Sequence, residues 1–112
     1  MVEGAKIDKG GHARDISECI DEYLSFDRVV GKAMNFADRD GETLVVVTSD
    51  HETGGLILLD GNYHTGTILG NFATNDHTGT PVPIFSYGAN ADVFTGFIEN
   101  SDIMEKIISL FE

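Results

Sequence analysis

The sequence predicts an α/β fold with a mostly parallel sheet, because apolar strands and amphipathic helices alternate along the chain. Residues 44–47 are an uninterrupted run of Leu and Val inside a strand expected over residues 43–49, a pattern typical of a strand buried in a parallel sheet. A helix is expected over residues 13–40, and a further strand over residues 82–87. About three strands is few for an open sheet, which usually has about four to six. We therefore expect residues 1–112 to form a single partial domain within a larger one.

The first twelve residues are rich in glycine and polar groups. We expect a strand to end near Glu3, a loop to begin at Gly4, and a tight turn to form at Gly10-Gly11. Nothing in the sequence caps or leads into this first element, so we expect the chain to start inside it.

The helix expected over residues 13–40 is predicted by apolar residues at helical spacing. Gly41 is well placed to end this helix, and a break within residues 25–27 is the alternative. A strand end near Glu3, this helix and the strand over residues 43–49 would together form a βαβ unit. The apolar positions are Ile16, Cys19, Ile20, Tyr23, Leu24, Val30, Ala33, Met34 and Ala37.

The second half of the chain alternates short apolar segments with polar ones. Residues 56–59 predict a short strand that a turn at residues 60–62 would close. Residues 62–80 have little periodicity, and we expect a long loop of functional importance. A final amphipathic helix would be capped by Ser101 or Asp102.

The composition excludes some partners. The chain has 19 acidic and 7 basic residues and a formal net charge of −12, which argues against nucleic acid and against an anionic membrane surface. Bound cations could offset this charge at a phosphate site. The single cysteine, Cys19, allows no intrachain disulfide and is expected to be a buried, inert thiol. No apolar run approaches the length of a membrane span.

Several potential metal ligands lie in predicted loops and at strand ends. Asp50 and His51 directly follow the strand over residues 43–49, at the edge where open α/β sheets carry their sites, and zinc accepts both residue types. Two such sites a few ångströms apart form a clamp for displacement at phosphorus. Each residue alone also fits an ordinary turn or surface position, so spacing leaves both interpretations open. The candidates are Glu3, Asp8, His12, Asp50, His51, His64 and His77.

Three segments carry a resemblance to a known family: VEGAKIDKGGHARD at 2–15, TLVVVTSDHETGG at 43–55 and DHTGTPVPIFSYG at 76–88. In this order and spacing they resemble the C-terminal part of alkaline phosphatase. The resemblance implies a three-layer α/β/α sandwich in which residues 1–112 are the C-terminal portion of the catalytic domain. For the implied ligands to meet, strand 82–87 must run antiparallel to strand 43–49, or residues 76–81 must wrap back.

The resemblance also implies a role for each candidate ligand. His77 is preferred to His64 because it alone stands in the sequence HTGTPVP, and Lys9 would lie near the phosphate, in contact with it or with water. Glu52, Thr53 and Gly54 are candidates for orienting the ligands. The implied ligands are Glu3 for a magnesium ion, Asp8, His12 and His77 for a first zinc, and Asp50 and His51 for a second zinc.

For a full-length parent, the resemblance implies hydrolysis of phosphate monoesters through a phosphoserine intermediate, with two Zn²⁺ and one Mg²⁺. It further implies a periplasmic or secreted homodimer that binds a phosphate monoester or inorganic phosphate, and neither nucleic acid nor membrane insertion. The nucleophilic serine belongs to an upstream segment, and neither Ser49 nor Ser86 has its context, so we expect this chain alone to be inactive. The alternative is a non-catalytic metal-binding or interaction module. A sulfatase or phosphodiesterase relative is disfavoured by Glu3 and Lys9.

Overall fold

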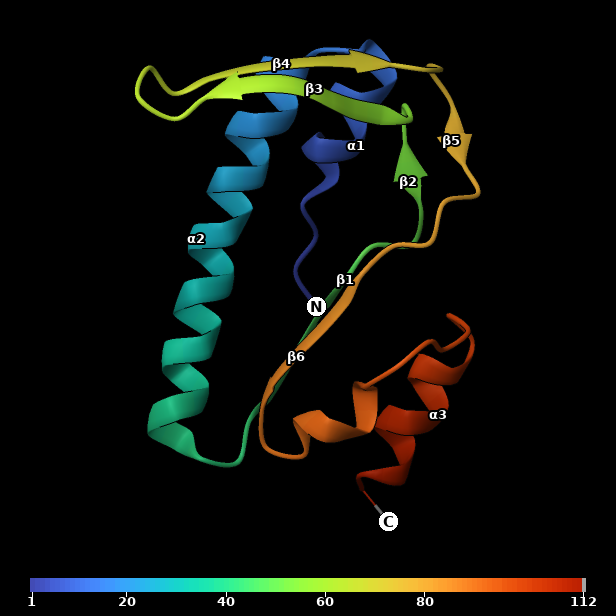
Figure 1. The fold of residues 1–112 in the computed structure, drawn as a ribbon. Helices are drawn as coiled ribbons and strands as arrows, with labels where there is room; N and C mark the ends of the chain where they lie inside the picture. Colours follow the sequence, from blue (N-terminus) through green and yellow to red (C-terminus); the bar gives the residue numbers. More distant parts are fainter. Residues whose placement is uncertain (112) are drawn as a thin grey trace. The chain divides into compact units, whose positions relative to one another are not determined.

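Two α-helices, six short strands, a 3₁₀ helix and a last α-helix follow one another along residues 1–111, the part of the chain that the computed structural model describes (Figure 1). The chain forms two units, one made of residues 1–28 and 51–81, the other of residues 29–50 and 82–112. In chain order the elements are α1 (Ala5–Ala13), α2 (Ile16–Asp40), β1 (Leu44–Thr48), β2 (Glu52–Thr53), β3 (Leu56–Asn62), β4 (Thr67–Phe72), β5 (His77–Thr78), β6 (Ile84–Gly88), the 3₁₀ helix η1 (Ala91–Phe94) and α3 (Asp102–Ser109).

The first unit begins with a helix that the sequence did not predict. Residues 1–4 have no regular structure, so the expected strand end at Glu3 is wrong, as is the βαβ unit that depended on it. Gly10-Gly11 lies inside α1 and not in a turn. The helix ends at Arg14, whose backbone is left-handed with φ of 55°.

Two helices therefore replace the single helix expected over residues 13–40. Asp15 starts α2, because its Oδ1 accepts a hydrogen bond from the Glu18 N–H at 3.0 Å. The helix then runs without a break to Asp40, so the alternative of an interruption at residues 25–27 is also wrong. Gly41 ends α2 as predicted, with φ of 74° and its N–H bonded to the Ala37 carbonyl.

Glycine permits close packing between α1 and its neighbours. A Cβ atom on Gly10 would lie 2.9 Å from the Cys19 Sγ, and one on Gly11 would lie 3.0 Å from the Cβ of Thr53. Both glycines are buried, and so is Cys19, which is 8% exposed as a free thiol. The first unit thus packs β2 and the start of α2 against α1 at positions where any larger side chain would collide.

Residues 56–72 form a hairpin where the sequence analysis expected one short strand and a loop. Strand β3 continues through Asp60-Gly61 to Asn62, so the turn predicted at residues 60–62 is wrong. The turn lies at residues 63–66, and the β3–β4 register shifts between Leu58 and Asp60. Strand β5 also falls in the predicted loop, and it pairs antiparallel with β2.

The second unit contains the predicted strand pair. Strand β1 runs antiparallel to β6, from Leu44 opposite Gly88 to Thr48 opposite Ile84, which confirms the antiparallel alternative. Strand β1 is only partly buried, and β6 is its one strand neighbour within residues 1–111. Phe94 of η1 is 3% exposed, and the Lys106 Nζ of α3 donates to the Val93 carbonyl at 2.9 Å.

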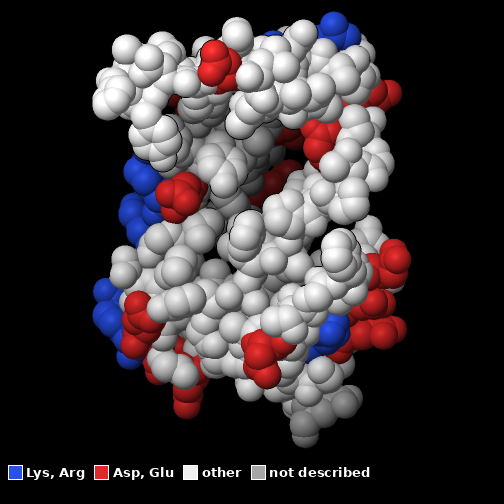
Figure 2. All heavy atoms as spheres, in the orientation of Figure 1, with Lys and Arg blue, Asp and Glu red and all other residues white. Residues whose placement is uncertain are grey.

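The surface carries the acidic excess of the sequence. Figure 2 shows acidic side chains spread over many parts of the visible face, not gathered in one patch. Among residues 1–111, no helix is both long and apolar enough to cross a membrane.

Candidate metal centre

Helix α1 presents Asp8 and His12 on one face, because residues four apart in a helix lie one turn above each other. The His12 Nε2 is 3.5 Å from the Asp8 Oδ1. The tight turn expected at Gly10-Gly11 does not bring these side chains together. A helical turn does so instead.

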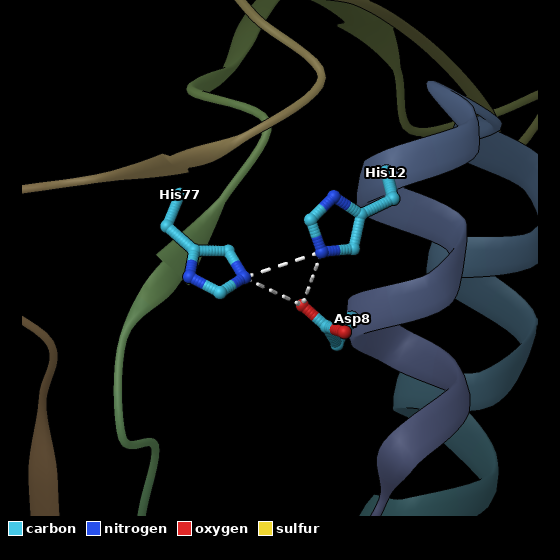
Figure 3. Close-up of side chains that lie close together, drawn as sticks. All are labelled: Asp8, His12 and His77. Atoms are coloured by element: carbon cyan, nitrogen blue, oxygen red, sulfur yellow. Dashed lines mark hydrogen bonds and ion pairs between the residues drawn. The ribbon is translucent and has the colours of Figure 1, made fainter.

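His77 reaches the same place from β5 (Figure 3). Its Nε2 lies 3.2 Å from the His12 Nε2 and 3.8 Å from the Asp8 Oδ1. One donor atom from each of these three residues lies within 4.8 Å of the other two. The side chains of Asp8, His12 and His77 are 41, 39 and 45% exposed, so an ion can reach them from solvent.

The spacing of the three donor atoms fits a single zinc ion. Zinc binds nitrogen and oxygen at about 2.0–2.2 Å in tetrahedral geometry, which separates two ligands of one ion by about 3.3–3.6 Å. The three observed separations, 3.2, 3.5 and 3.8 Å, bracket this range. Two imidazole lone pairs 3.2 Å apart repel each other unless a proton or a cation lies between them. A carboxylate and two imidazoles are also a donor set that zinc prefers.

A backbone hydrogen bond orients His12. Its Nδ1 lies 2.7 Å from the carbonyl oxygen of Asn75. A carbonyl only accepts, so the Nδ1 must carry the proton, and in the neutral ring the Nε2 then keeps its lone pair. That lone pair is the one a metal ion requires, on the nitrogen that faces Asp8 and His77.

Thr53 connects Asp8 with a second predicted ligand, His51. The Thr53 hydroxyl donates to the Asp8 Oδ1 at 2.6 Å and lies 3.2 Å from the His51 Nδ1. Since its only proton goes to Asp8, the Thr53 oxygen accepts from the His51 Nδ1–H. The His51 ring stacks on His77, with centroids 3.5 Å apart and planes 20° apart.

These neighbours also stabilise the ionised form of Asp8. The hydrogen bond from Thr53 lowers the pKa of Asp8 most, partial burial opposes it, and the nearby His12, His51 and His77 lower it further. The net pKa lies below the usual range for aspartate. Asp8 is therefore a carboxylate, ready to bind a cation, at any pH near neutrality.

Glu52 is held as a carboxylate close by. Burial raises the pKa of Glu52, but hydrogen bonds from Thr78, Gly55 and Leu56 and the charge of His51 lower it more, and the net pKa lies below the usual value. Glu52, Thr53 and Gly54 are the orienting residues that the family resemblance implies, whereas Thr78 and the Asn75 carbonyl were not predicted. The carbonyl is a backbone group and carries no sequence signal.

The other predicted residues lie outside the three-residue group. Glu3 is exposed ahead of α1, and Lys9 is exposed on α1 beside Asp8. Asp50 is exposed and lies two residues after the end of β1. His64 is exposed in the turn of the β3–β4 hairpin, where its N–H donates to the Asn62 Oδ1 at 2.9 Å. His77, in contrast, lies beside Asp8 and His12.

Comparison with known proteins supports the resemblance drawn from the motifs. The family model described as alkaline phosphatase matches residues 1–71. Alkaline phosphatase H of Pseudomonas aeruginosa (strain UCBPP-PA14) is 36% identical over 123 residues, which cover 96% of this chain and 26% of that protein. Streptomycin-6-phosphate phosphatase of Streptomyces griseus is 34% identical over 129 residues, covering 96% of this chain and 28% of that protein.

The fold is shared with solved alkaline phosphatases. The enzyme from the Antarctic bacterium TAB5 superposes with a TM-score of 0.88 at 42% identity, covering 96% of this chain and 33% of that one. A mutant of the TAB5 enzyme with Mg bound in its M3 site gives the same TM-score at 41% identity, covering 96% of this chain and 34% of that one. The likeness confirms the predicted α/β class.

The chain spans about a quarter of the length of the curated relatives it matches and about a third of the solved structures. Within that span, motifs, family model and fold agree. This chain belongs to the alkaline phosphatase family.

Proposed function

We propose that residues 1–112 are the C-terminal portion of the catalytic domain of a metal-dependent phosphate-monoester hydrolase. The convergence of Asp8, His12 and His77 within 4.8 Å of one another carries the proposal. Their donor chemistry and spacing fit one zinc ion. The parent would have the three-layer α/β/α architecture with a mostly parallel sheet.

The remaining ligands follow the family resemblance. Glu3 would bind a magnesium ion, Asp50 and His51 a second zinc, and Lys9 would contact phosphate or its water. When bound, the cations supply the positive charge that a chain with a net charge of −12 needs beside a phosphate. The parent's ligand would be a phosphate monoester or inorganic phosphate, and the parent would be a periplasmic or secreted homodimer.

The residues of this chain bind and orient, and they do not attack phosphorus. Asp8 presents a carboxylate, while the Asn75 carbonyl accepts from the His12 Nδ1–H and so orients the His12 ring. The serine that forms the phosphoserine intermediate would come from another segment of the parent. The 112-residue chain alone should therefore leave an aryl phosphate unhydrolysed.

Calorimetric titration of the purified chain with Zn²⁺ near neutral pH tests the site. We expect about one tightly bound zinc per chain, the number that one tetrahedral set of ligands takes, and loss of this binding in His77→Ala. His64→Ala is the matched control and should bind as the wild type does. Equal zinc binding by His77→Ala and the wild type would contradict the ligand assignment.

Phosphatase function is tested in a chimera in which this chain replaces the matching third of the TAB5 enzyme. The chimera should hydrolyse p-nitrophenyl phosphate, and its His77→Ala variant should not, whereas the His64→Ala variant should remain active. A folded, zinc-loaded chimera without activity would favour the alternative of a non-catalytic metal-binding module.

A further inference from the structure

A very short strand pair delivers His77 to Asp8 and His12. Strands β2 and β5 have two residues each, and their register places Glu52 opposite Thr78 and Thr53 opposite His77. A two-stranded ladder of this length is not stable by itself in water. Further interactions must therefore fix the position of β5.

The Glu52 carboxylate provides such interactions. Its Oε2 accepts the Gly55 N–H at 3.0 Å, and its Oε1 accepts the Leu56 N–H at 3.3 Å. These two bonds fasten the carboxylate to the segment that follows β2. The Oε2 also accepts the hydroxyl proton of Thr78, which lies on the other strand. Glu52 thus joins β5 to an already anchored group.

The alternation of side chains in a strand divides the pair into two faces. Glu52 and Thr78 lie on one face, while Thr53 and His77, opposite each other, lie on the other. The second face is the one that meets α1, because Thr53 donates to Asp8 and the His77 Nε2 lies 3.8 Å from the same carboxylate. The bond between Glu52 and Thr78 therefore holds the strand pair from the face away from the metal ligands.

We propose that Glu52 is a positioning residue that sets the location of the His77 imidazole through Thr78. This inference rests on the proposed zinc site of Asp8, His12 and His77. Glu52 touches neither substrate nor ion in this role. Removing a group that orients a metal ligand typically lowers the metal affinity by about 10- to 100-fold.

Zn²⁺ affinity, measured by competition with a chromophoric chelator, tests the proposal in Glu52→Gln and Thr78→Val. Glutamine keeps the size of Glu52 but has one acceptor oxygen for three donors, and valine removes only the hydroxyl of Thr78. Each variant should bind zinc about 10- to 100-fold more weakly. Glu22→Gln is the matched control, since Glu22 bonds only to the exposed Lys6 among the contacts described, and it should bind zinc as the wild type does.

The decisive measurement repeats Glu52→Gln in a His77→Ala background, at Zn²⁺ concentrations high enough to measure the weak binding that Asp8 and His12 retain. If Glu52 acts through His77, the substitution should cause no further loss of affinity there. A general loosening of the chain would weaken the remaining ligands equally in both backgrounds, which would overturn the proposal. Unchanged zinc affinity in the two single variants would also overturn the proposal. So would circular dichroism spectra that show both variants unfolded in the absence of zinc, because Glu52 would then stabilise the whole fold and not the position of His77.

The same titrations separate this inference from the proposed function. If His77→Ala binds zinc like the wild type, the proposed site itself is wrong. If His77→Ala loses the ion while Glu52→Gln and Thr78→Val keep it, the site stands and only the role of Glu52 fails.

Discussion

Replacing Gly11 with alanine should weaken both the fold and the proposed zinc site. Gly11 is buried in α1, and an added Cβ would lie 3.0 Å from the Cβ, the Cγ2 and the carbonyl oxygen of Thr53. Thr53 must then move away from α1, although its hydroxyl bonds to Asp8 on the same helix. Gly31, in the middle of α2, is the matched control, because a Cβ there would meet nothing within 4 Å.

Both substitutions should gain the higher helix propensity of alanine, but only Gly11→Ala should also create a steric clash. Alanine stabilises a helix by up to about 1 kcal/mol relative to glycine. Overpacking a close contact costs about 1–3 kcal/mol. Gly31→Ala should therefore raise the free energy of unfolding by about 1 kcal/mol, and Gly11→Ala should change it by between about 0 and −2 kcal/mol. The difference between the two variants equals the contact cost.

Thermal unfolding followed by circular dichroism measures this difference. At about 4 °C per kcal/mol for a domain of this size, Gly31→Ala should melt about 4 °C higher than the wild type. Gly11→Ala should melt at the same temperature or up to about 8 °C lower, and it should bind Zn²⁺ more weakly. An equal increase in Tm for both variants, with unchanged zinc affinity, would refute the close packing of β2 on α1.

Two titration predictions concern groups away from the metal ligands. The Tyr87 hydroxyl donates to the Asp38 Oδ1 at 2.6 Å, and this bond and the Asp38 charge raise the pKa of Tyr87. Asp38→Asn should therefore shift the ultraviolet titration of Tyr87 to lower pH. Comparison with Tyr87→Phe identifies which part of the titration belongs to Tyr87. Burial, with help from the charges of Asp15 and Glu18, raises the pKa of Cys19. The folded thiol should therefore react slowly with a disulfide reagent at neutral pH and quickly in urea. Because its pKa is raised on folding, Cys19 should also make unfolding easier as the pH rises above about 8.5. Rapid labelling of the native chain, or an Asp38→Asn titration identical to the wild type, would contradict these assignments.

The sequence signalled those elements whose local pattern is strong. The Leu and Val run gave β1, helical periodicity gave most of α2, and Gly41 marked its end. The last helix, α3, also lies where its amphipathic pattern placed it. Each of these signals depends only on neighbouring residues.

Helix α1 was not predicted because its own sequence has a low helix propensity. It contains two adjacent glycines, and glycine costs about 1 kcal/mol relative to alanine in a helix. What supports it is packing against Cys19 of the next helix and against Thr53, which lies far along the chain. The glycines that weaken the helix locally are those that allow this packing, so the sequence pattern pointed to a turn.

The hairpin of β3 and β4 was missed for a different reason. Asp60-Gly61 has the composition of a turn, but it lies within β3 next to an irregularity in the register. The true turn ends at Gly66, whose φ is 65°. Motif context predicted Asp8, His12 and His77 as candidate ligands, and the structure brings their side chains together. The pairing of Glu52 with Thr78 could not be predicted, because it depends on a strand register that no local pattern encodes.

The base of this hairpin is closed by hydrogen bonds close to the candidate metal centre. The Gly54 N–H bonds to the Asp76 carbonyl at 3.0 Å, and the Gly54 carbonyl accepts the N–H groups of Ala73 and Thr74. The chain thus leaves the centre and returns to the same point. Residues added at the hairpin tip would lengthen a loop whose two ends are already held together, and each doubling of the length of a flexible loop costs only about 0.6 kcal/mol. Segments can therefore be inserted at the hairpin tip without moving the candidate metal ligands.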